Sequence, residues 1–285
     1  MSKLKIAIQK SGRLSQKSVA LLEECGLKFP NGGGKLITEC TNFPVEILFL
    51  RDDDIPQYVE QNVAHIGIIG ENVFLESEKA ITIVEKLNFS VCRLSLAVPK
   101  EIDYPGINFF KGKKVATSYP NILQKYFKEN RIEATVEVIS GSVEIAPGIG
   151  LADGICDIVS SGSTLLSNGL KEVETVVKSQ AVMVANPNLD EEAQQILNKL
   201  LFRIRSVQKA KENKYILLNS PNSQLEKIIQ ILPGMNSPTI LPLAKDGWSS
   251  LHSVISEDKF WYVIDELKKA GAEGILVVPI EKMIL

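Results

Sequence analysis

The sequence predicts an α/β protein with two lobes and a smaller C-terminal module. Short apolar runs alternate with amphipathic helical segments along most of the chain, which is typical of sheets with mainly parallel strands. Two similar extended segments, 94–99 and 181–187, each end in or near a proline, as expected where a chain crosses between lobes and later returns. From residue 214 onward the elements follow the order βαββαβ, which is typical of a ferredoxin-like module.

The first lobe has the element pattern of a parallel sheet, in which apolar runs predict strands and helical periodicity predicts helices. The expected strands are 4–9, 45–50 and 66–69, and the expected helices are 15–24 and 55–62. The segment Pro30-Asn31-Gly32-Gly33-Gly34 is expected to form a flexible loop between elements, because glycine permits many backbone conformations.

The second lobe is expected to begin near Cys92 and to contain a further α/β unit. Its expected strands are 94–98, 114–117, 136–139, 155–159 and 173–177, with a helix at 122–129 and a short helix near Val143. The strand expected at 181–185 then lies in the region where the chain returns to the first lobe.

A long helix is expected after this return, with Asp190 as its N-cap and acidic residues in its first turn. It extends to about Lys211 and ends in a basic turn. The predicted domains are therefore 1–91 together with 179–213, then 92–178, and finally 214–285.

The C-terminal module has alternating strand and helix signals of its own. The expected strands are 215–218, 239–243, 251–255 and 274–278, and the expected helices are 223–232 and 259–270. Pro233, Gly234 and Gly271 mark the helix ends. Because helices cover only one face of so small a sheet, the other face needs cover, which favours association or effector binding over chemistry.

Composition excludes several classes of function. With 45% hydrophobic residues and a net charge of −2, the 285-residue chain has real cores and no basic face, so bulk nucleic-acid binding is disfavoured. No apolar run approaches the ~18 residues that span a membrane, and the N-terminus opens directly into a strand rather than a signal peptide. Four widely spaced cysteines are expected to be reduced, and two histidines cannot form a histidine-based metal cluster alone. We therefore expect a cytoplasmic protein.

The segment 144–166, EIAPGIGLADGICDIVSSGSTLL, is the most informative part of the chain. An apolar strand ends at Val159 and is followed by Ser160, Ser161, Gly162, Ser163 and Thr164. A loop of this kind directs several N–H groups and hydroxyls toward one point, which suits a phosphate, although an ordinary turn has the same composition. Asp153 and Asp157 accompany the strand, and an acid there needs partners such as ribose hydroxyls or a metal-bound phosphate.

Three other strand-to-helix junctions carry candidate ligand-binding residues. Lys10 and Arg13 follow the first strand at the sheet edge where open α/β sheets bind ligands, although a solvated loop is an equal alternative. Arg51 emerges at the same edge, whereas two of the three aspartates that follow it are expected to cap a helix. Gly67 and Gly70 permit close backbone approach, and Glu71 and Asn72 are suited to contact a base or ribose, with a plain helix start as the alternative.

Several long segments resemble one known family, the ATP phosphoribosyltransferases of histidine biosynthesis in their long, histidine-regulated form. The resemblance covers essentially the whole chain. Its specific motifs are QKSGRLS (9–15), RDDDIP (51–56), GIIGEN (67–72), CRLSLAVP (92–99), ATSYP (116–120), GSVEIAPGIGLADGICDIVSSGSTLLSNGL (141–170), SPTILPLA (237–244) and GILVVPIEKM (274–283).

This resemblance implies a fold and a reaction. The first two domains would form a periplasmic-binding-protein-like pair with the active site between them. Adenine N1 of ATP would attack the anomeric carbon of phosphoribosyl pyrophosphate (PRPP) with inversion, releasing pyrophosphate, with Mg²⁺ carried mainly by PRPP and pyrophosphate rather than by a certain protein site. The family also implies feedback inhibition by histidine, inhibition by AMP or ADP, and a hexamer built from dimers.

The resemblance also implies roles for individual residues. Ser160–Thr164 would hold the 5′-phosphate of PRPP, with Glu144, Asp153 and Asp157 beside the ribose hydroxyls or the metal. Lys10 and Arg51 would meet the pyrophosphate. ATP would contact Arg13, Gly70, Glu71 and Tyr119, and histidine would contact Met235, Thr239, Ser253 and Gly274.

Two alternatives remain open from the sequence. A non-catalytic two-lobed ligand sensor with an effector domain has the same element pattern, and so does a PRPP transferase with another acceptor. Fold alone does not decide among them.

Overall fold

The structure is a computed structural model, and it describes residues 3–30, 35–235 and 237–284. The glycines of the expected flexible loop at 30–34 therefore lie outside the described residues. Contacts divide the chain into two compact units, 1–197 and 198–285, and each unit is described by itself. Among the described residues, none of the helices combines the length and the apolar character that crossing a membrane requires.

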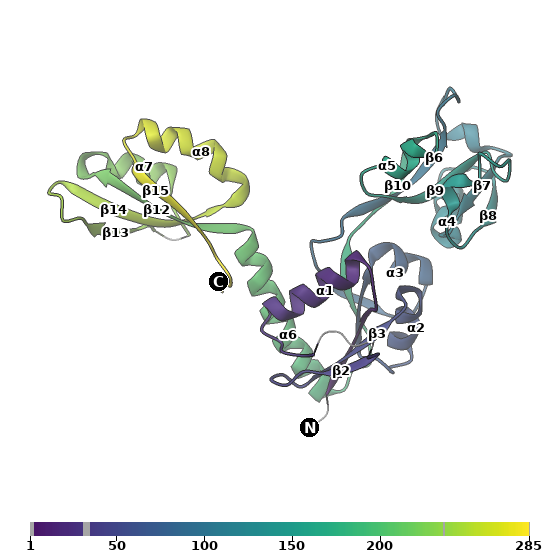
Figure 1. The fold of residues 1–285 in the computed structure, drawn as a ribbon, viewed down its shortest axis with the longest axis horizontal. Helices are drawn as coiled ribbons and strands as arrows, with labels where there is room; N and C mark the ends of the chain where they lie inside the picture. The colour runs from purple at the N-terminus through teal and green to yellow at the C-terminus, as the bar shows by residue number, and fades with distance from the viewer. Residues whose placement is uncertain (1–2, 31–34, 236, 285) are drawn as a thin grey trace. The chain divides into compact units, whose positions relative to one another are not determined.

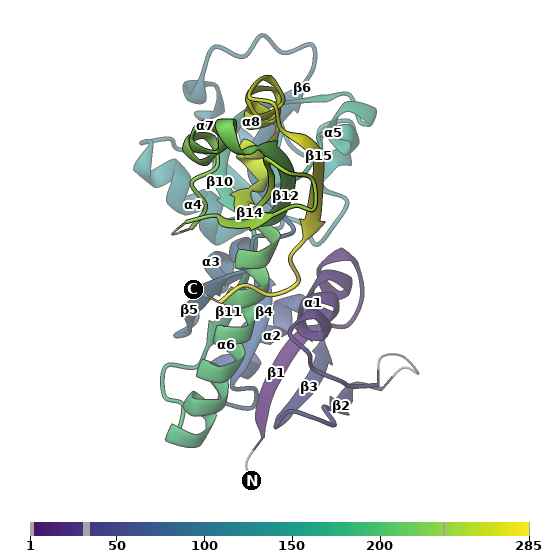
Figure 2. The same cartoon turned by 90° about the vertical axis from the view of Figure 1, so that its left-hand side faces the viewer.

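The first sheet of unit 1 has six strands in the order β2-β3-β1-β4-β11-β5. They are β2 (Ile37–Glu39), β3 (Val45–Leu50), β1 (Leu4–Gln9), β4 (Ile66–Gly70), β11 (Ala181–Ala185) and β5 (Thr82–Lys86). Strand β1 is parallel to both β3 and β4, so these three strands have their carboxyl ends at one edge. Figure 2 shows β1, β3 and β2 next to one another.

Helices cover both faces of this sheet, with α1 on one face and α2 and α3 on the other (Figure 1). They are α1 (Arg13–Glu24), α2 (Ile55–Glu60), which follows a 3₁₀ turn at Asp52–Asp54, and α3 (Glu71–Ser77). Ile55, Val59 and Val73 from the helices pack on Ala7 and Val182 of the sheet. Burial of this apolar layer holds the strand ends in fixed register.

The second sheet of unit 1 has the order β10-β6-β9-β7-β8. Its strands are β10 (Leu170–Ser179), β6 (Cys92–Pro99), β9 (Gly154–Val159), β7 (Lys114–Thr117) and β8 (Thr135–Val138). Its helices are α4 (Pro120–Glu129), α5 (Ser163–Ser167) and the 3₁₀ turns η2 (Ile107–Phe110) and η3 (Val143–Ile145). Strand β7 is parallel to β8 and β9, so these carboxyl ends also share one edge.

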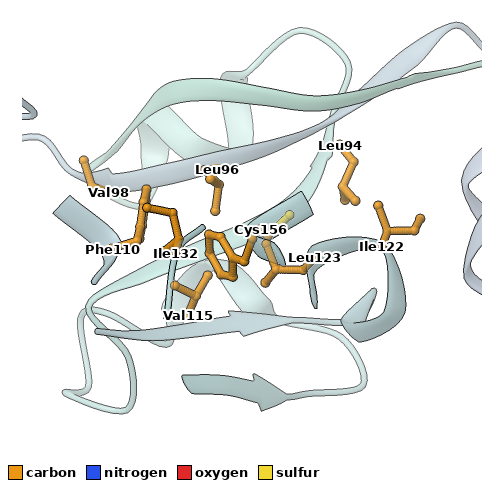
Figure 3. Packing of buried hydrophobic residues seen from close by; sticks show 10 residues of the cluster. Leu94, Leu96, Val98, Phe110, Val115, Ile122, Leu123, Ile132 and Cys156 are labelled. Atoms are coloured by element: carbon orange, nitrogen blue, oxygen red, sulfur yellow. The ribbon is translucent and has the colours of Figure 1, made fainter. Parts of the chain in front are cut away.

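The core of this lobe lies between β6, β9 and β7 on one side and α4 on the other. Leu96, Phe110, Val115, Leu123 and Cys156 are fully buried and pack together there (Figure 3). The free thiol of Cys156 is part of this core, which agrees with a reduced, packed cysteine.

Two crossings connect the sheets of unit 1. The chain passes from the first sheet to the second between β5 and β6, and it returns between β10 and β11. The first lobe is therefore discontinuous in sequence.

Unit 2 is an antiparallel sheet with helices on one face, joined to unit 1 by helix α6 (Glu191–Lys211). The backbone N–H of Ala193 donates to Asp190 Oδ1 at 2.7 Å, which confirms Asp190 as the N-cap. The strands, in the order β13-β14-β12-β15, are β13 (Thr239–Pro242), β14 (Trp248–Ser256), β12 (Asn213–Pro221) and β15 (Glu273–Pro279). With the turn η4 (Asn222–Gln224), α7 (Leu225–Ile231) and α8 (Glu257–Lys269), the order βαββαβ is confirmed.

The structure corrects several element boundaries. Strands β2 and β5 are not among the predicted strands, because both lie at sheet edges and carry exposed or half-buried side chains that give no buried apolar run. Strands β10, β12 and β14 are longer than expected, since backbone pairing continues through polar residues at their ends. At Gly70–Glu71 the helix-start alternative is correct as a description of the backbone.

Candidate active site

The carboxyl edge of the first sheet brings two cations together. Gln9 and Leu50 are register partners at the ends of β1 and β3, and the backbone N–H of Lys10 donates to Leu50 O at 2.8 Å. Lys10 and Arg51 therefore follow neighbouring strands, and both side chains are exposed. This edge can neutralise phosphate charge.

The end of β4 places Gly70 and Glu71 at the same edge. Glu71 begins α3, and its carboxylate forms an ion pair with Lys86 Nζ at 3.2 Å. The Glu71 carboxylate is thus already paired, which sets it apart from the exposed cations nearby.

The three aspartates after Arg51 only partly take the capping role expected for two of them. Asp52–Asp54 form the 3₁₀ turn that leads into α2, and Asp54 occupies the N-cap position of α2, but its side chain makes no cap hydrogen bond. Burial raises the pKa of Asp53, and the charges of Asp52 and Asp54 raise it further. At the helix start the backbone N–H of Ile55 donates to Asp52 O, so a backbone carbonyl takes the place of the expected side-chain acceptor.

The serine-rich loop has the expected strand, loop and helix-start geometry. Strand β9 ends at Val159, α5 starts at Ser163, and Gly162 between them has a φ of 82°, a conformation that favours glycine. The hydroxyls of Ser161 and Ser163 lie 3.1 Å apart, and the loop side chains are exposed apart from the half-buried Gly162. First-turn N–H groups have no partner within their own helix, so this loop presents donors for an anion.

Arg93 holds the start of this loop, and the sequence reasoning did not identify it. Its guanidinium binds the carboxylate of Glu172 through two nitrogens, and its Nη1 donates to Ser160 O at 3.3 Å. Ser95 Oγ also donates to Glu172, at 2.8 Å. The only sequence signal was the position of Arg93 within the 92–99 motif, because its partners come from β9 and β10.

Two acids lie together near the same edge. Asp157 is half-buried on β9, and burial raises the pKa of its carboxyl, with the charge of Glu144 adding to the effect. The pKa of Tyr119 is raised by burial first, then by the charges of Asp157 and Asp52. The structure therefore brings Asp157, Glu144 and Tyr119 into one electrostatic environment. Among the described residues, no group of three or more His, Cys, Asp or Glu side chains is placed to hold a metal ion.

Asp153 does not lie beside the loop, contrary to expectation. It precedes β9, whereas the loop follows β9, so a six-residue strand, about 20 Å long, separates them. Its carboxylate accepts hydrogen bonds from Lys113 Nζ at 3.2 Å and from the backbone N–H of Lys114 at 2.9 Å. These bonds lower the pKa of Asp153 and hold it at the start of β7, at the end of the sheet opposite the serine-rich loop.

Two adjoining cavities lie between the carboxyl edges of the two sheets of unit 1. One, of 320 Å³, has Arg13, Gly70, Tyr119 and Ser160 in its wall. The other, of 530 Å³, is lined by residues that include Glu76, Ser118 and Ser140. Asp52, Val73 and Tyr119 line both cavities.

Asn72, which the sequence offered with Glu71 as a group suited to contact a base or ribose, is a further wall residue. Its backbone N–H donates to Ser179 Oγ at 3.0 Å, and the same hydroxyl donates to its Oδ1 at 2.8 Å. Its side chain lowers the pKa of the Tyr119 hydroxyl, against the larger raising effect of burial. These contacts join α3, the end of β10 and Tyr119 of the second lobe.

The four residues expected to contact histidine lie in unit 2, and the structure brings only some of them together. Ser253 on β14 is buried and its Oγ has no hydrogen-bond partner among the described residues. This oxygen lies 2.9 Å from where a Cβ on Gly234 would stand, so Ser253 lies under the loop that carries Met235 and leads to Thr239. Gly274, with a φ of 55°, is instead next to Asn219.

The first sheet carries exposed cations at its carboxyl ends, and the second carries a hydroxyl-rich loop, with cavities between them. This arrangement is typical of enzymes that bind phosphorylated substrates. Comparison with known families gives the particular class. Residues 51–206 match the model "HisG: ATP phosphoribosyltransferase", and residues 210–282 match "HisG, C-terminal domain". The chain belongs to the ATP phosphoribosyltransferase family.

Individual relatives agree with this assignment. An ATP phosphoribosyltransferase from Azobacteroides pseudotrichonymphae is 59% identical and one from Phocaeicola vulgatus is 56% identical, each over 99% of this chain and 100% of the relative. A solved structure titled as an ATP phosphoribosyl transferase (HisG:HisZ) complex from Thermotoga maritima has a TM-score of 0.60 and 31% identity, covering 71% of this chain and 98% of that one. The chain is a pentosyltransferase that joins ATP and PRPP in the first step of histidine biosynthesis.

Proposed function

We propose that the reaction takes place between the two carboxyl edges of unit 1, where the two cavities adjoin. The observation that carries this proposal is that Tyr119 and Asp52, one from each lobe, line both cavities. ATP and PRPP must be held side by side, and adjoining spaces with a shared wall meet that need. We also propose the domain limits 1–91 with 179–213, 92–178 and 214–285.

The chemistry requires charge neutralisation more than covalent catalysis. As adenine N1 attacks the anomeric carbon with inversion, positive charge develops on the sugar and negative charge on the departing pyrophosphate. Lys10 and Arg51 are exposed at the end of neighbouring strands, where they meet the pyrophosphate. Fixed cations stabilise such a leaving group without reorganising, so no protein nucleophile is needed.

On the second sheet, Ser160, Ser161, Gly162, Ser163 and Thr164 bind the 5′-phosphate of PRPP. The positive φ of Gly162 turns the chain sharply, and the exposed hydroxyls and first-turn N–H groups donate to phosphate oxygens. Helix α5 has only five residues, so these donors matter more than a helix dipole. Arg93 keeps the loop in place through the Ser160 carbonyl.

Asp157 and Glu144 bind the ribose side of PRPP. Burial makes it costly for Asp157 to hold a negative charge in the folded protein, and ribose hydroxyls or a cation would relieve this cost. Carboxylate oxygens are also the ligands that Mg²⁺ prefers, so this pair fits a shared Mg²⁺ carried by PRPP. When bound, Mg²⁺ neutralises charge on the pyrophosphate. Asp153 is left out of this group because its carboxylate is bound at the other end of β9.

ATP binds on the side of the smaller cavity. Arg13, Gly70 and Tyr119 line it, and Arg13 supplies a cation for the triphosphate. Glu71 stays a candidate at the same edge, with its carboxylate held by Lys86. This cavity also contains Ser160, which places the two substrates against each other.

Regulation belongs to unit 2. Histidine inhibits by contacting Met235, Thr239, Ser253 and Gly274, and the unpaired, buried Ser253 Oγ is the polar group that supports this assignment. Because Gly274 lies apart from Ser253 within one chain, the site is completed between copies in a dimer or hexamer. AMP or ADP inhibits at the ATP site. The cytoplasmic location stays a prediction from the sequence.

A coupled assay tests the proposed function. The full-length protein is mixed with ATP, PRPP and Mg²⁺ in the presence of pyrophosphatase, and near-ultraviolet absorbance is followed with and without histidine. A rise that needs all three components and falls with histidine supports both activity and regulation. A rise that ignores histidine removes the regulatory assignment, and PRPP binding without a rise favours another acceptor. If the protein shows no turnover and does not bind PRPP, a ligand sensor is favoured instead.

A further inference from the structure

Glu76 of the first lobe binds the start of a helix in the second lobe. Its Oε1 accepts a hydrogen bond from the backbone N–H of Asn121 at 2.9 Å, and its Oε2 accepts one from Ile122 at 3.0 Å. Asn121 Nδ2 in turn donates to Glu76 O at 2.9 Å. Three hydrogen bonds thus connect α3 to the first turn of α4.

Helix α4 needs such a partner because its own sequence does not supply one. It begins at Pro120, and Tyr119 occupies the N-cap position, where no side chain makes the usual N-cap hydrogen bond. The N–H groups of Asn121 and Ile122 have no intrahelical acceptor. A carboxylate at this position satisfies both N–H groups and has a favourable interaction with the positive end of the helix.

The same contact fixes a wall of the proposed site. Tyr119 directly precedes α4 and lines both cavities, and Glu76 lines the larger one beside it. Asn72, one turn before Glu76 on α3, lines the smaller cavity together with Tyr119. Helix α3 therefore holds the start of α4 through Glu76 and shares a cavity wall with Tyr119 through Asn72.

We propose that Glu76 is a positioning residue that holds the two lobes together across the cleft and fixes Tyr119 in its wall. This inference rests on the proposed location of the active site between the lobes. Substrates that contact both lobes bind only to molecules with the lobes in this arrangement. Losing the Glu76 contact lowers the fraction of such molecules, and apparent affinity falls by the same fraction. Once both substrates are bound, the residues that contact them are the same as in the wild type, so kcat is largely preserved.

Glu76→Gln in the full-length protein tests this inference, with Glu78→Gln as the matched control. The amide is nearly the same size but replaces one acceptor oxygen with a donor, which cannot face a backbone N–H. Glu78 is a nearby acid on the same segment and is exposed. We expect Glu76→Gln to raise KM for ATP and PRPP about tenfold with kcat within about twofold, and Glu78→Gln to match the wild type.

Amide hydrogen exchange provides a readout that does not depend on activity. We expect the N–H groups of Asn121 and Ile122 to lose protection in Glu76→Gln and to keep it in Glu78→Gln. Unchanged exchange at these two amides would show that Glu76 does not hold α4 and would overturn the inference. Faster exchange with unchanged KM, or a fall in kcat alone, would reduce Glu76 to a structural cap and overturn its positioning role. If the wild type itself is inactive, the proposed function fails, while the exchange result still tests the contact.

Discussion

The two ends of strand β9 carry aspartates that the sequence presents alike and the structure separates. Asp157, near the carboxyl end, is half-buried beside Glu144, and burial raises the pKa of its carboxyl. Asp153, before the amino end, is bound by Lys113 and Lys114, and the pKa of its carboxyl is lowered. One acid is held at a cost in folding free energy, and the other contributes to sheet stability. Four residues along a strand are enough to separate the acid proposed to bind ligand, Asp157, from the acid with a structural role, Asp153.

Turnover should distinguish the two aspartates most strongly. Asp157→Asn removes a charge-assisted contact to PRPP, so kcat/KM for PRPP should fall by about ten- to a hundredfold. Asp153→Asn should change kcat/KM by less than about twofold, because its partners are protein groups at the other edge. Steady-state kinetics on both variants checks this, and equal losses would contradict the separation.

Arg93, which holds the serine-rich loop proposed to bind phosphate, should give a smaller effect. Arg93→Lys keeps a positive charge but loses the two-pronged grip on Glu172, so the loop is held less firmly. We expect KM for PRPP to rise by about three- to tenfold, with KM for ATP unchanged. Arg131→Lys, an exposed arginine in the same lobe, is the control and should leave both constants unchanged. A rise in both constants would contradict a role limited to the loop.

Thermal stability should move in opposite directions for the two aspartates. Asp157→Asn removes a half-buried charge and should raise Tm by about 1–3 °C, as is common where an active site is held at a cost. Asp153→Asn removes a partly exposed ion pair worth about 0.2–1 kcal/mol and should lower Tm slightly. Calorimetry on the proteins without substrate checks both signs, and shifts in the same direction would refute the electrostatic contrast.

Acid pH should reduce the two Tm differences in turn. The destabilisation from ionised Asp157 shrinks as pH falls below its raised folded pKa, because the folded protein then takes up a proton, and it is gone below the ordinary pKa. The stability that Asp153 contributes is present above its ordinary pKa and is lost as pH falls through its lowered folded pKa. At about pH 4 the Asp157→Asn difference should therefore be smaller than at about pH 7, while the Asp153→Asn difference should be largely kept. A larger Asp157→Asn difference at about pH 4, or the loss of the Asp153→Asn difference there, would contradict these assignments.

The sequence predicted the central elements well because they carry local signals. Buried strands such as β1 and β7 are apolar runs, and Asp190 starts α6 as an N-cap. The edge strands β2 and β5 were missed because their side chains are largely exposed and only backbone pairing defines them.

The strand, loop and helix start around the serine-rich loop were predicted for the same local reason, since the strand, glycine turn and hydroxyls are consecutive. Arg93 and Glu76 were missed because each acts on a partner 45 or more positions away, across sheet pairing or between lobes. Asp153 was misplaced because closeness in sequence is not closeness in space along an extended strand. Residues that act through distant partners need the fold before they can be recognised.

Calorimetric titration of PRPP with Mg²⁺ into the wild type, Asp157→Asn and Asp153→Asn tests the central claim most directly. We expect Asp157→Asn to bind PRPP at least about tenfold more weakly, and Asp153→Asn to bind it as the wild type does. Weakened binding in Asp153→Asn together with unchanged binding in Asp157→Asn would contradict a PRPP site at the carboxyl end of β9.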